Sequence, residues 1–198
     1  MTITVAHARM LKVLVLLATF LLAVSFKLPN ASAQEALGAP FALSDPTGKV
    51  VRSTDFKGKW MLIYFGYSHC ADLCPTELEE MIDALRQIGP EAKRVQPIFI
   101  TIDPERDKGQ YLRDFVAQFD DRLLGLGGTP QQVASVAANY GIRFNKILKS
   151  DGSYSFKHTS NIFVINPEGQ YQVTFSHMSD AYMIASKMLE LISKQRGS

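Results

Sequence analysis

Residues 60–75 decide how this chain is expected to fold, and they read Trp60-Met61-Leu62-Ile63-Tyr64-Phe65-Gly66-Tyr67-Ser68-His69-Cys70-Ala71-Asp72-Leu73-Cys74-Pro75. The first half is rich in aromatic and aliphatic residues without clear alternation, which is typical of a strand buried on both faces. Pro75 suits the first position of a helix, and apolar residues then follow at helical spacing, namely Leu78, Met81, Ile82, Leu85 and Ile88. Cys70 and Cys74, the two cysteines of the 198-residue chain, lie where this strand passes into this helix. The stretch therefore predicts thiol chemistry or soft-metal binding at that junction.

Strand and helix patterns alternate on either side of this stretch. Turn residues 45–48 and 166–169 each separate two short apolar segments and predict hairpins at 41–53 and 161–175. Further strands are expected at 95–102 and 123–126, and further helices at 111–119, 129–140 and 180–194. This order predicts an α/β, thioredoxin-like fold, in which a central mixed β-sheet has helices on both faces and an N-terminal β-hairpin. In open sheets of this kind the functional site lies at the carboxyl ends of the strands, where both cysteines fall.

The N-terminus has the composition of an export signal. Arg9 and Lys12 precede an uncharged apolar run of 14 residues, 13–26, and Ala31-Ser32-Ala33 offers a small-residue cleavage site. The run is shorter than the roughly 18 residues of a typical spanning helix, although flanking residues would let it act as a tilted anchor. We therefore expect residues 1–33 to be a signal peptide or membrane anchor and residues 34–198 to form one domain. A mitochondrial transit peptide is the alternative, but such peptides are amphipathic and rich in Arg and Ser.

The charge balance argues against a nucleic-acid partner. Without Arg9, Lys12 and Lys27 of the leader, 18 basic residues face 19 acidic ones, and no basic run interleaves with aromatic residues. Outside the reducing cytosol a disulfide between Cys70 and Cys74 is permitted.

The spacing Cys-x-x-x-Cys differs from the Cys-x-x-Cys of thioredoxin-type redox motifs. Residues four apart in a helix bring their Cβ atoms to about 5–6 Å, whereas a disulfide needs roughly 3.5–4.5 Å. Binding of one ion by both sulfurs therefore needs less distortion than a bridge. The start of a helix also favours the thiolate, which is both the nucleophile and the metal ligand.

Two thiolates need a third ligand. Zinc would take four, and no second cysteine or histidine pair is present, whereas two thiolates and one imidazole suit copper. His69 adjoins Cys70 but should diverge from it on an extended segment, and His177 with Met178 follows the last strand. We choose His158, on an expected loop just before residues 161–165. The alternatives are a structural disulfide or inert thiols for the cysteines, and a surface histidine for His158.

Three segments resemble the signatures of the Sco/SenC family: residues 65–75, the stretch Thr101-Ile102-Asp103-Pro104-Glu105-Arg106-Asp107, and His158-Thr159. The resemblance extends over nearly the whole chain after the leader. It implies a thioredoxin-like, exported protein that binds copper, as Cu(I) or Cu(II), and helps to build the dinuclear copper centre of cytochrome c oxidase. By position, Cys70, Cys74 and His158 would be the copper ligands, the two cysteines also the redox pair, and Asp103 an outer-shell group.

The resemblance further implies a periplasmic protein, soluble or tethered to the inner membrane by residues 13–26. Its expected partner is the copper-centre subunit of the oxidase, with other copper carriers or thiol reductants as further partners, and we expect a monomer. Two residues depart from the family pattern. Ala71 replaces a common proline, which should loosen the loop, and Lys157 replaces an acid, which removes a carboxylate that would orient His158.

Two functions remain open at this point. The first is a metallochaperone that holds copper through Cys70, Cys74 and His158. The second is an enzyme, an exported thiol-disulfide oxidoreductase that reduces client cysteines through Cys70 and Cys74. A peroxidase of the peroxiredoxin type would need a lone cysteine with a hydroxyl and an arginine around it, and no such motif is present.

Overall fold

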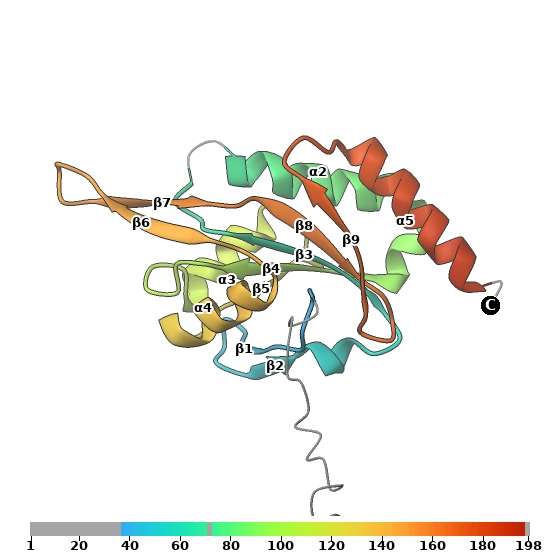
Figure 1. Cartoon of the computed structure of the whole chain (residues 1–198), viewed down its shortest axis with the longest axis horizontal. Helices are drawn as coiled ribbons and strands as arrows, with labels where there is room; N and C mark the ends of the chain where they lie inside the picture. The colour runs from blue at the N-terminus through green and yellow to red at the C-terminus, as the bar shows by residue number, and fades with distance from the viewer. Residues whose placement is uncertain (1–36, 71–72, 197–198) are drawn as a thin grey trace, which may run out of the picture. The chain divides into compact units, whose positions relative to one another are not determined.

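The computed structural model describes residues 37–70 and 73–196, without the side chains of Leu73 and Cys74, and is built around one five-stranded sheet (Figure 1). Strand β3 (Trp60–Gly66) lies in the middle, parallel to β4 (Val95–Thr101) and antiparallel to β8 (Asn161–Ile165). Strand β5 (Leu124–Leu126) pairs with β4 in parallel, and β9 (Tyr171–Ser176) pairs with β8 in antiparallel. All seven residues of β3 are buried, because both of its faces are covered. The predicted central mixed sheet is confirmed.

Within the described residues, four α-helices cover the sheet on its two faces. Figure 1 shows α2 (Leu73–Gln87) and α5 (Ala181–Arg196) on one face, with α3 (Gly109–Ala117) and α4 (Pro130–Asn139) on the other. Helix α2 begins two residues before the expected Pro75. The expected layers are therefore present, with helix ends displaced by one or two residues.

Short elements complete the N-terminal half. The predicted hairpin consists of β1 (Ala42–Ser44) and β2 (Val50–Arg52), followed by the 3-10 helix η1 (Ser53–Phe56). A second 3-10 helix, η2 (Gly89–Arg94), connects α2 to β4.

A two-stranded ribbon, β6 (Phe144–Leu148) with β7 (Tyr154–His158), was not predicted. It extends from the end of the sheet at which β3 and β4 finish (Figure 1). No residue of β6 is buried, so the sequence lacks the alternation of a half-buried strand. His158 is consequently the last residue of a strand, paired with Phe144, and the prediction that it lies on a loop was wrong.

The predicted leader, including the apolar run 13–26, lies outside the described residues. Among the described helices, none combines the length and the apolar character needed to cross a membrane.

Candidate metal centre

Cys70 lies in a turn that directly follows the central strand. Its backbone N–H donates to the carbonyl of Tyr67 at 3.3 Å, and its half-buried side chain packs against the core. The carbonyl of Gly66, at the end of β3, accepts the N–H of Ile102 at 2.8 Å. The turn therefore starts from the most buried strand of the sheet and at the carboxyl ends of β3 and β4, as predicted.

A buried carboxylate fixes the residue at the start of this turn. Asp107, only 1% exposed, accepts hydrogen bonds from the Ser68 backbone N–H at 2.8 Å and from the Ser68 hydroxyl. It also accepts one from the Thr101 hydroxyl at 2.8 Å. Asp107 lies within the second family signature, and no role was predicted for it from the sequence. A second acid four residues after Asp103, at the end of a buried strand, was the available signal.

His69 turns towards helix α3. Its Nδ1 lies 2.9 Å from the Ser68 hydroxyl and 3.6 Å from an Asp107 carboxylate oxygen. Its ring stacks on Tyr111 at 5.4 Å between centroids and 25° between planes, with 40% of the side chain exposed. These contacts give His69 a structural role beside the cysteine turn.

Cys74 is the second residue of α2, and its side chain lies outside the described residues. This position is in the first helical turn, where the backbone N–H groups lack intrahelical partners and the helix dipole favours an anion. A thiolate at this position is therefore favoured by the helix, as the sequence predicts.

His158 reaches the cysteine turn through an aromatic contact with Tyr67. The two rings meet edge to face, with their centroids 5.9 Å apart, and Tyr67 is also the residue whose carbonyl accepts the Cys70 N–H. The His158 Nδ1 lies 2.9 Å from the Thr159 carbonyl oxygen. A proton on Nδ1 would satisfy that carbonyl and leave the Nε2 lone pair for a metal ion.

Asp103 contacts β7, the strand that ends in His158, at the opposite end of that strand. It is 1% exposed, pairs with the Arg106 guanidinium and accepts a hydrogen bond from the Tyr154 hydroxyl at 3.0 Å. Burial and this hydrogen bond raise the pKa of Tyr154. Since Tyr154 lies four residues before His158 on β7, the outer-shell role of Asp103 stays a prediction, and the structure gives Asp103 a part in holding the ribbon.

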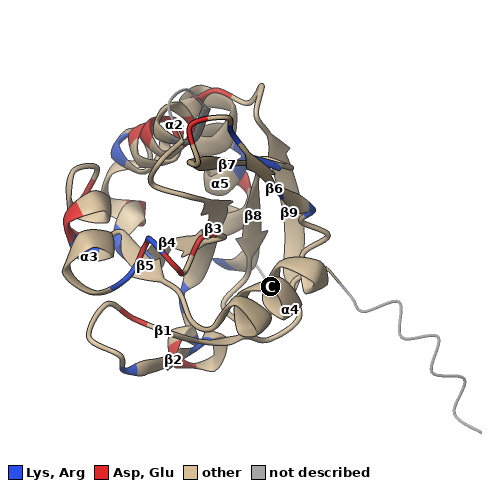
Figure 2. Cartoon of the chain, turned by 90° about the vertical axis from the view of Figure 1, so that its left-hand side faces the viewer, with Lys and Arg blue, Asp and Glu red and all other residues tan. Residues whose placement is uncertain are grey.

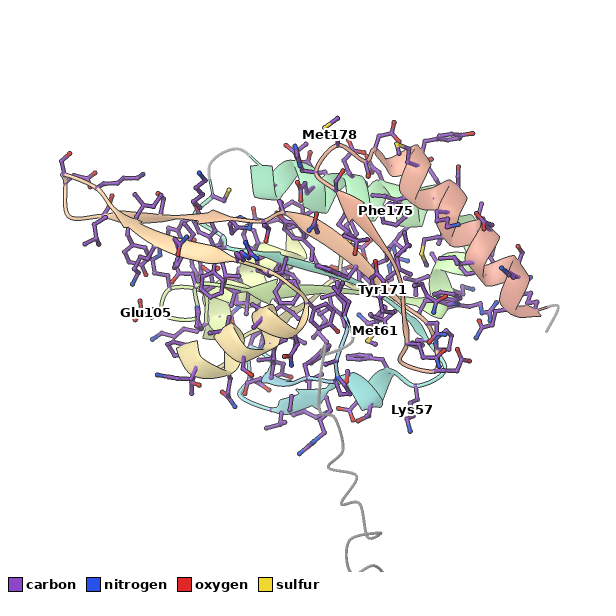
Figure 3. The ribbon with its side chains drawn as sticks, in the orientation of Figure 1. Lys57, Met61, Glu105, Tyr171, Phe175 and Met178 are labelled. Carbon is purple, nitrogen blue, oxygen red and sulfur yellow. The ribbon has the colours of Figure 1, made fainter. Side chains whose placement is uncertain are left out.

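Opposite charges also hold the middle of the ribbon. Lys146 on β6 lies 2.7 Å from Glu105, which follows β4 and is labelled in Figure 3, and 3.9 Å from the centre of the Tyr154 ring. The hydrogen bond and charge of Lys146 hold the pKa of Glu105 below its usual value, and the Glu105 carboxylate raises the pKa of Lys146. Figure 2 shows basic residues along the ribbon, whereas α2 carries mostly acidic ones.

The donors predicted from sequence suit copper. Thiolates are soft ligands, and two of them with one imidazole match the preferences of Cu(I). Among the described side chains, which do not include that of Cys74, no three His, Cys, Asp or Glu residues gather as a metal-binding group.

The sequence model of the SCO1/SenC family matches residues 29–193. The chain belongs to the SCO1/SenC family. It is 37% identical over 166 residues to the human "Protein SCO2 homolog, mitochondrial", a match that covers 82% of this chain and 62% of that protein. It is 38% identical over 159 residues to the bovine SCO2 homolog, covering 78% and 60%. The chain thus spans less than two thirds of the length of these relatives.

Solved structures of the family share the fold. A copper-bound structure of Bradyrhizobium japonicum ScoI is 37% identical, with a TM-score of 0.72, and covers 78% of this chain and 99% of that one. A copper-bound structure of yeast Sco1 is 30% identical, with a TM-score of 0.73, and covers 82% and 94%. These matches confirm the thioredoxin-like fold that the sequence predicted.

Proposed function

We propose that this SCO1/SenC protein is an exported metallochaperone that binds one copper ion and delivers it to the dinuclear copper centre of cytochrome c oxidase. Cys70 and Cys74 supply two thiolates, and His158 supplies the imidazole. Residues 34–198 form the working domain, and residues 1–33 export it to the periplasm or tether it to the inner membrane. The partner is the copper-centre subunit of the oxidase.

The contact between Tyr67 and His158 carries this proposal. The rings meet at a centroid distance of 5.9 Å, and Tyr67 also closes the turn that contains Cys70. One residue therefore touches both the predicted imidazole ligand and the turn of the first predicted thiolate, although they are nearly ninety positions apart in sequence. Copper bound to B. japonicum ScoI and to yeast Sco1 supports the choice of metal.

Copper titration of the reduced full chain in mild detergent tests the proposal. We expect one Cu(I) per chain, measured by competition with a colorimetric chelator. His158→Ala should weaken binding by at least about tenfold, because loss of even an outer-shell partner of a metal ligand typically costs about 10–100-fold in affinity. His177→Ala, which alters an exposed histidine after β9, is the matched control. If His158→Ala binds copper as tightly as His177→Ala does, His158 is not a copper ligand.

A second function is favoured by the position of Cys74 in the first turn of α2. A thiolate favoured there is also a nucleophile. It would attack a client disulfide and form a mixed disulfide, which the other cysteine would resolve, leaving a Cys70–Cys74 disulfide and two client thiols. Excess copper given to cells that carry Cys70→Ser separates the two functions. Restored oxidase assembly supports delivery, and unrestored assembly supports reduction.

A further inference from the structure

A part-buried chain of hydrogen bonds meets at Ser160, between β7 and β8. The Ser160 hydroxyl donates to a carboxylate oxygen of Glu77 at 2.5 Å, and the Tyr64 hydroxyl lies 3.1 Å from the same Ser160 oxygen. Since Ser160 has a single hydroxyl proton and donates it to Glu77, Tyr64 donates to Ser160. Tyr64 is fully buried and Glu77 is 5% exposed. We call these three residues the brace.

The brace joins the three segments that carry the proposed ligands. Tyr64 is on β3, which leads into the turn of Cys70. Glu77 is on α2, three residues after position 74, and residues at this spacing share a helix face. Ser160 follows β7, two residues after its last residue. No other element is needed to connect the three.

Stability alone does not account for Glu77. Its second carboxylate oxygen is buried and has no hydrogen-bond partner among the described residues. Burying a polar group without a partner costs free energy, and apolar residues of similar volume often replace buried charged groups without loss of stability. A buried polar network does, however, favour one arrangement of the segments it connects. The free-energy cost of burying Glu77 is therefore consistent with a requirement that the connected segments keep one fixed geometry.

We propose that Glu77 and Ser160 are positioning residues for the copper site, holding α2 and the end of β7 at the separation that lets Cys74 and His158 bind one ion. The inference rests on the proposed function. Neither residue touches copper. The brace acts by fixing where the ligand-bearing segments lie before the metal arrives, so that less ordering is needed on binding.

Copper affinity of the reduced full chain in mild detergent tests the brace, using Cu(I) competition with a chelator. Ser160→Ala and Glu77→Leu should each weaken binding about tenfold, the lower end of the range for outer-shell groups at metal sites. The double variant should be no weaker than the single variants, because both break the same connection. Glu77→Gln, which keeps an oxygen that accepts from Ser160, should stay within about threefold of the wild-type affinity.

Glu80→Gln is the matched control. Glu80 lies on the same helix and accepts the Ala181 N–H at 2.5 Å, so it contacts α5 instead of the brace. Its variant should bind copper as the wild type does, even if it unfolds more easily. Wild-type affinity in both Ser160→Ala and Glu77→Leu would overturn the brace. If Glu77→Leu does not fold, Ser160→Ala alone decides.

A metal-free measurement separates failure of the brace from failure of the proposed function. The chain has four histidines, so the NMR signals of the His158 ring can be assigned with His158→Ala. The brace predicts shifted His158 signals in Ser160→Ala and unshifted ones in Glu80→Gln. If the wild type binds no copper, the proposed function fails and these signals still decide the brace. Unshifted signals in Ser160→Ala would overturn it.

Discussion

The Tyr67 hydroxyl pairs with the backbone of Phe156, donating to its carbonyl oxygen at 3.4 Å and accepting from its N–H at 3.3 Å. The Tyr67 side chain, directly after β3, thus bonds to the backbone in the middle of β7 as a neighbouring strand would. The two rings also meet edge to face at 5.4 Å. Since a two-stranded ribbon is marginally stable by itself, this pairing anchors the strand that ends in His158.

Removing only that hydroxyl should loosen the ribbon and weaken copper binding. In Tyr67→Phe the Phe156 N–H and carbonyl lose their partner, which should cost about 1–3 kcal/mol in the free energy of unfolding. Copper affinity should fall about tenfold, which equals about 1.4 kcal/mol. Urea unfolding and chelator competition measure the two effects. Tyr171→Phe, which loses a hydroxyl contact with Thr174 at the surface, is the control. A Tyr67→Phe protein with unchanged affinity would contradict an anchoring role.

Asp107 should control how firmly the turn of Cys70 is held. It accepts three hydrogen bonds while buried, and Asp107→Asn would direct an N–H₂ group at one of these donors. We expect a loss of about 1–3 kcal/mol of stability, the cost of an unmatched buried polar group. In a Cys74→Ser background, Cys70 should react several times faster with iodoacetamide. Asp114→Asn, an exposed acid on α3, should change neither quantity. An unchanged reaction rate in Asp107→Asn would show that other contacts hold the turn.

Overpacking between β5 and α3 should affect the turn of Cys70 from a distance. A Cβ added at Gly125 on β5 would lie 3.0 Å from Leu112 and 3.1 Å from Val116, both on the buried face of α3. Gly125→Ala should therefore cost about 1–3 kcal/mol, as overpacking usually does, and displace the helix that carries Tyr111. Urea unfolding and the NMR signals of the His69 ring, which stacks on Tyr111, measure this. Unchanged His69 signals would mean that α3 absorbs the extra volume locally.

The sheet and the position of the cysteines were predictable because local signals determined them. Seven consecutive apolar or small residues in β3 are compatible with burial on both faces, and Pro75 with the apolar spacing after it marks a helix. The strand order also follows from the order of the elements and the usual rules of connection. These signals lie within short windows of sequence.

The ribbon and the buried acids were not predictable in the same way. Strand β6 has no buried face, and the ribbon is held by Tyr67 and Phe156, which are 89 positions apart. Asp107 is buried because the Ser68 turn, 39 positions earlier in the chain, folds onto it, and its place four residues after Asp103 was the one local signal. Glu77 did leave a signal, since it lies four residues before the buried Met81 and thus continues the apolar stripe of α2. An acid on the apolar face of a helix indicates a buried partner.

Acid should release the middle of the ribbon through Glu105. Because Lys146 lowers the folded-state pKa of Glu105, the pair contributes stability above the ordinary Glu value of 4.5, and this contribution is lost as the pH falls through the lowered folded value. The pKa of Lys146 is raised, so the contribution of Lys146 to stability is fully present below its ordinary pKa of 10.5. It is lost only as the pH rises through the raised folded value. Both groups are largely exposed, so the effect should be local.

Hydrogen exchange of the β6 and β7 amides measures this release. At neutral pH, Lys146→Gln should exchange faster than the wild type in the ribbon, and the difference should shrink once Glu105 is protonated, because only the contact of Lys146 with the Tyr154 ring is then left to lose. NMR titration should show a higher Glu105 pKa in Lys146→Gln than in the wild type, because the donor and the charge that lower it are gone. Lys149→Gln, on the turn of the same ribbon, controls for loss of a positive charge. If the ribbon of Lys146→Gln exchanged as slowly as that of the wild type at neutral pH, the Lys146–Glu105 pair would have no part in holding it.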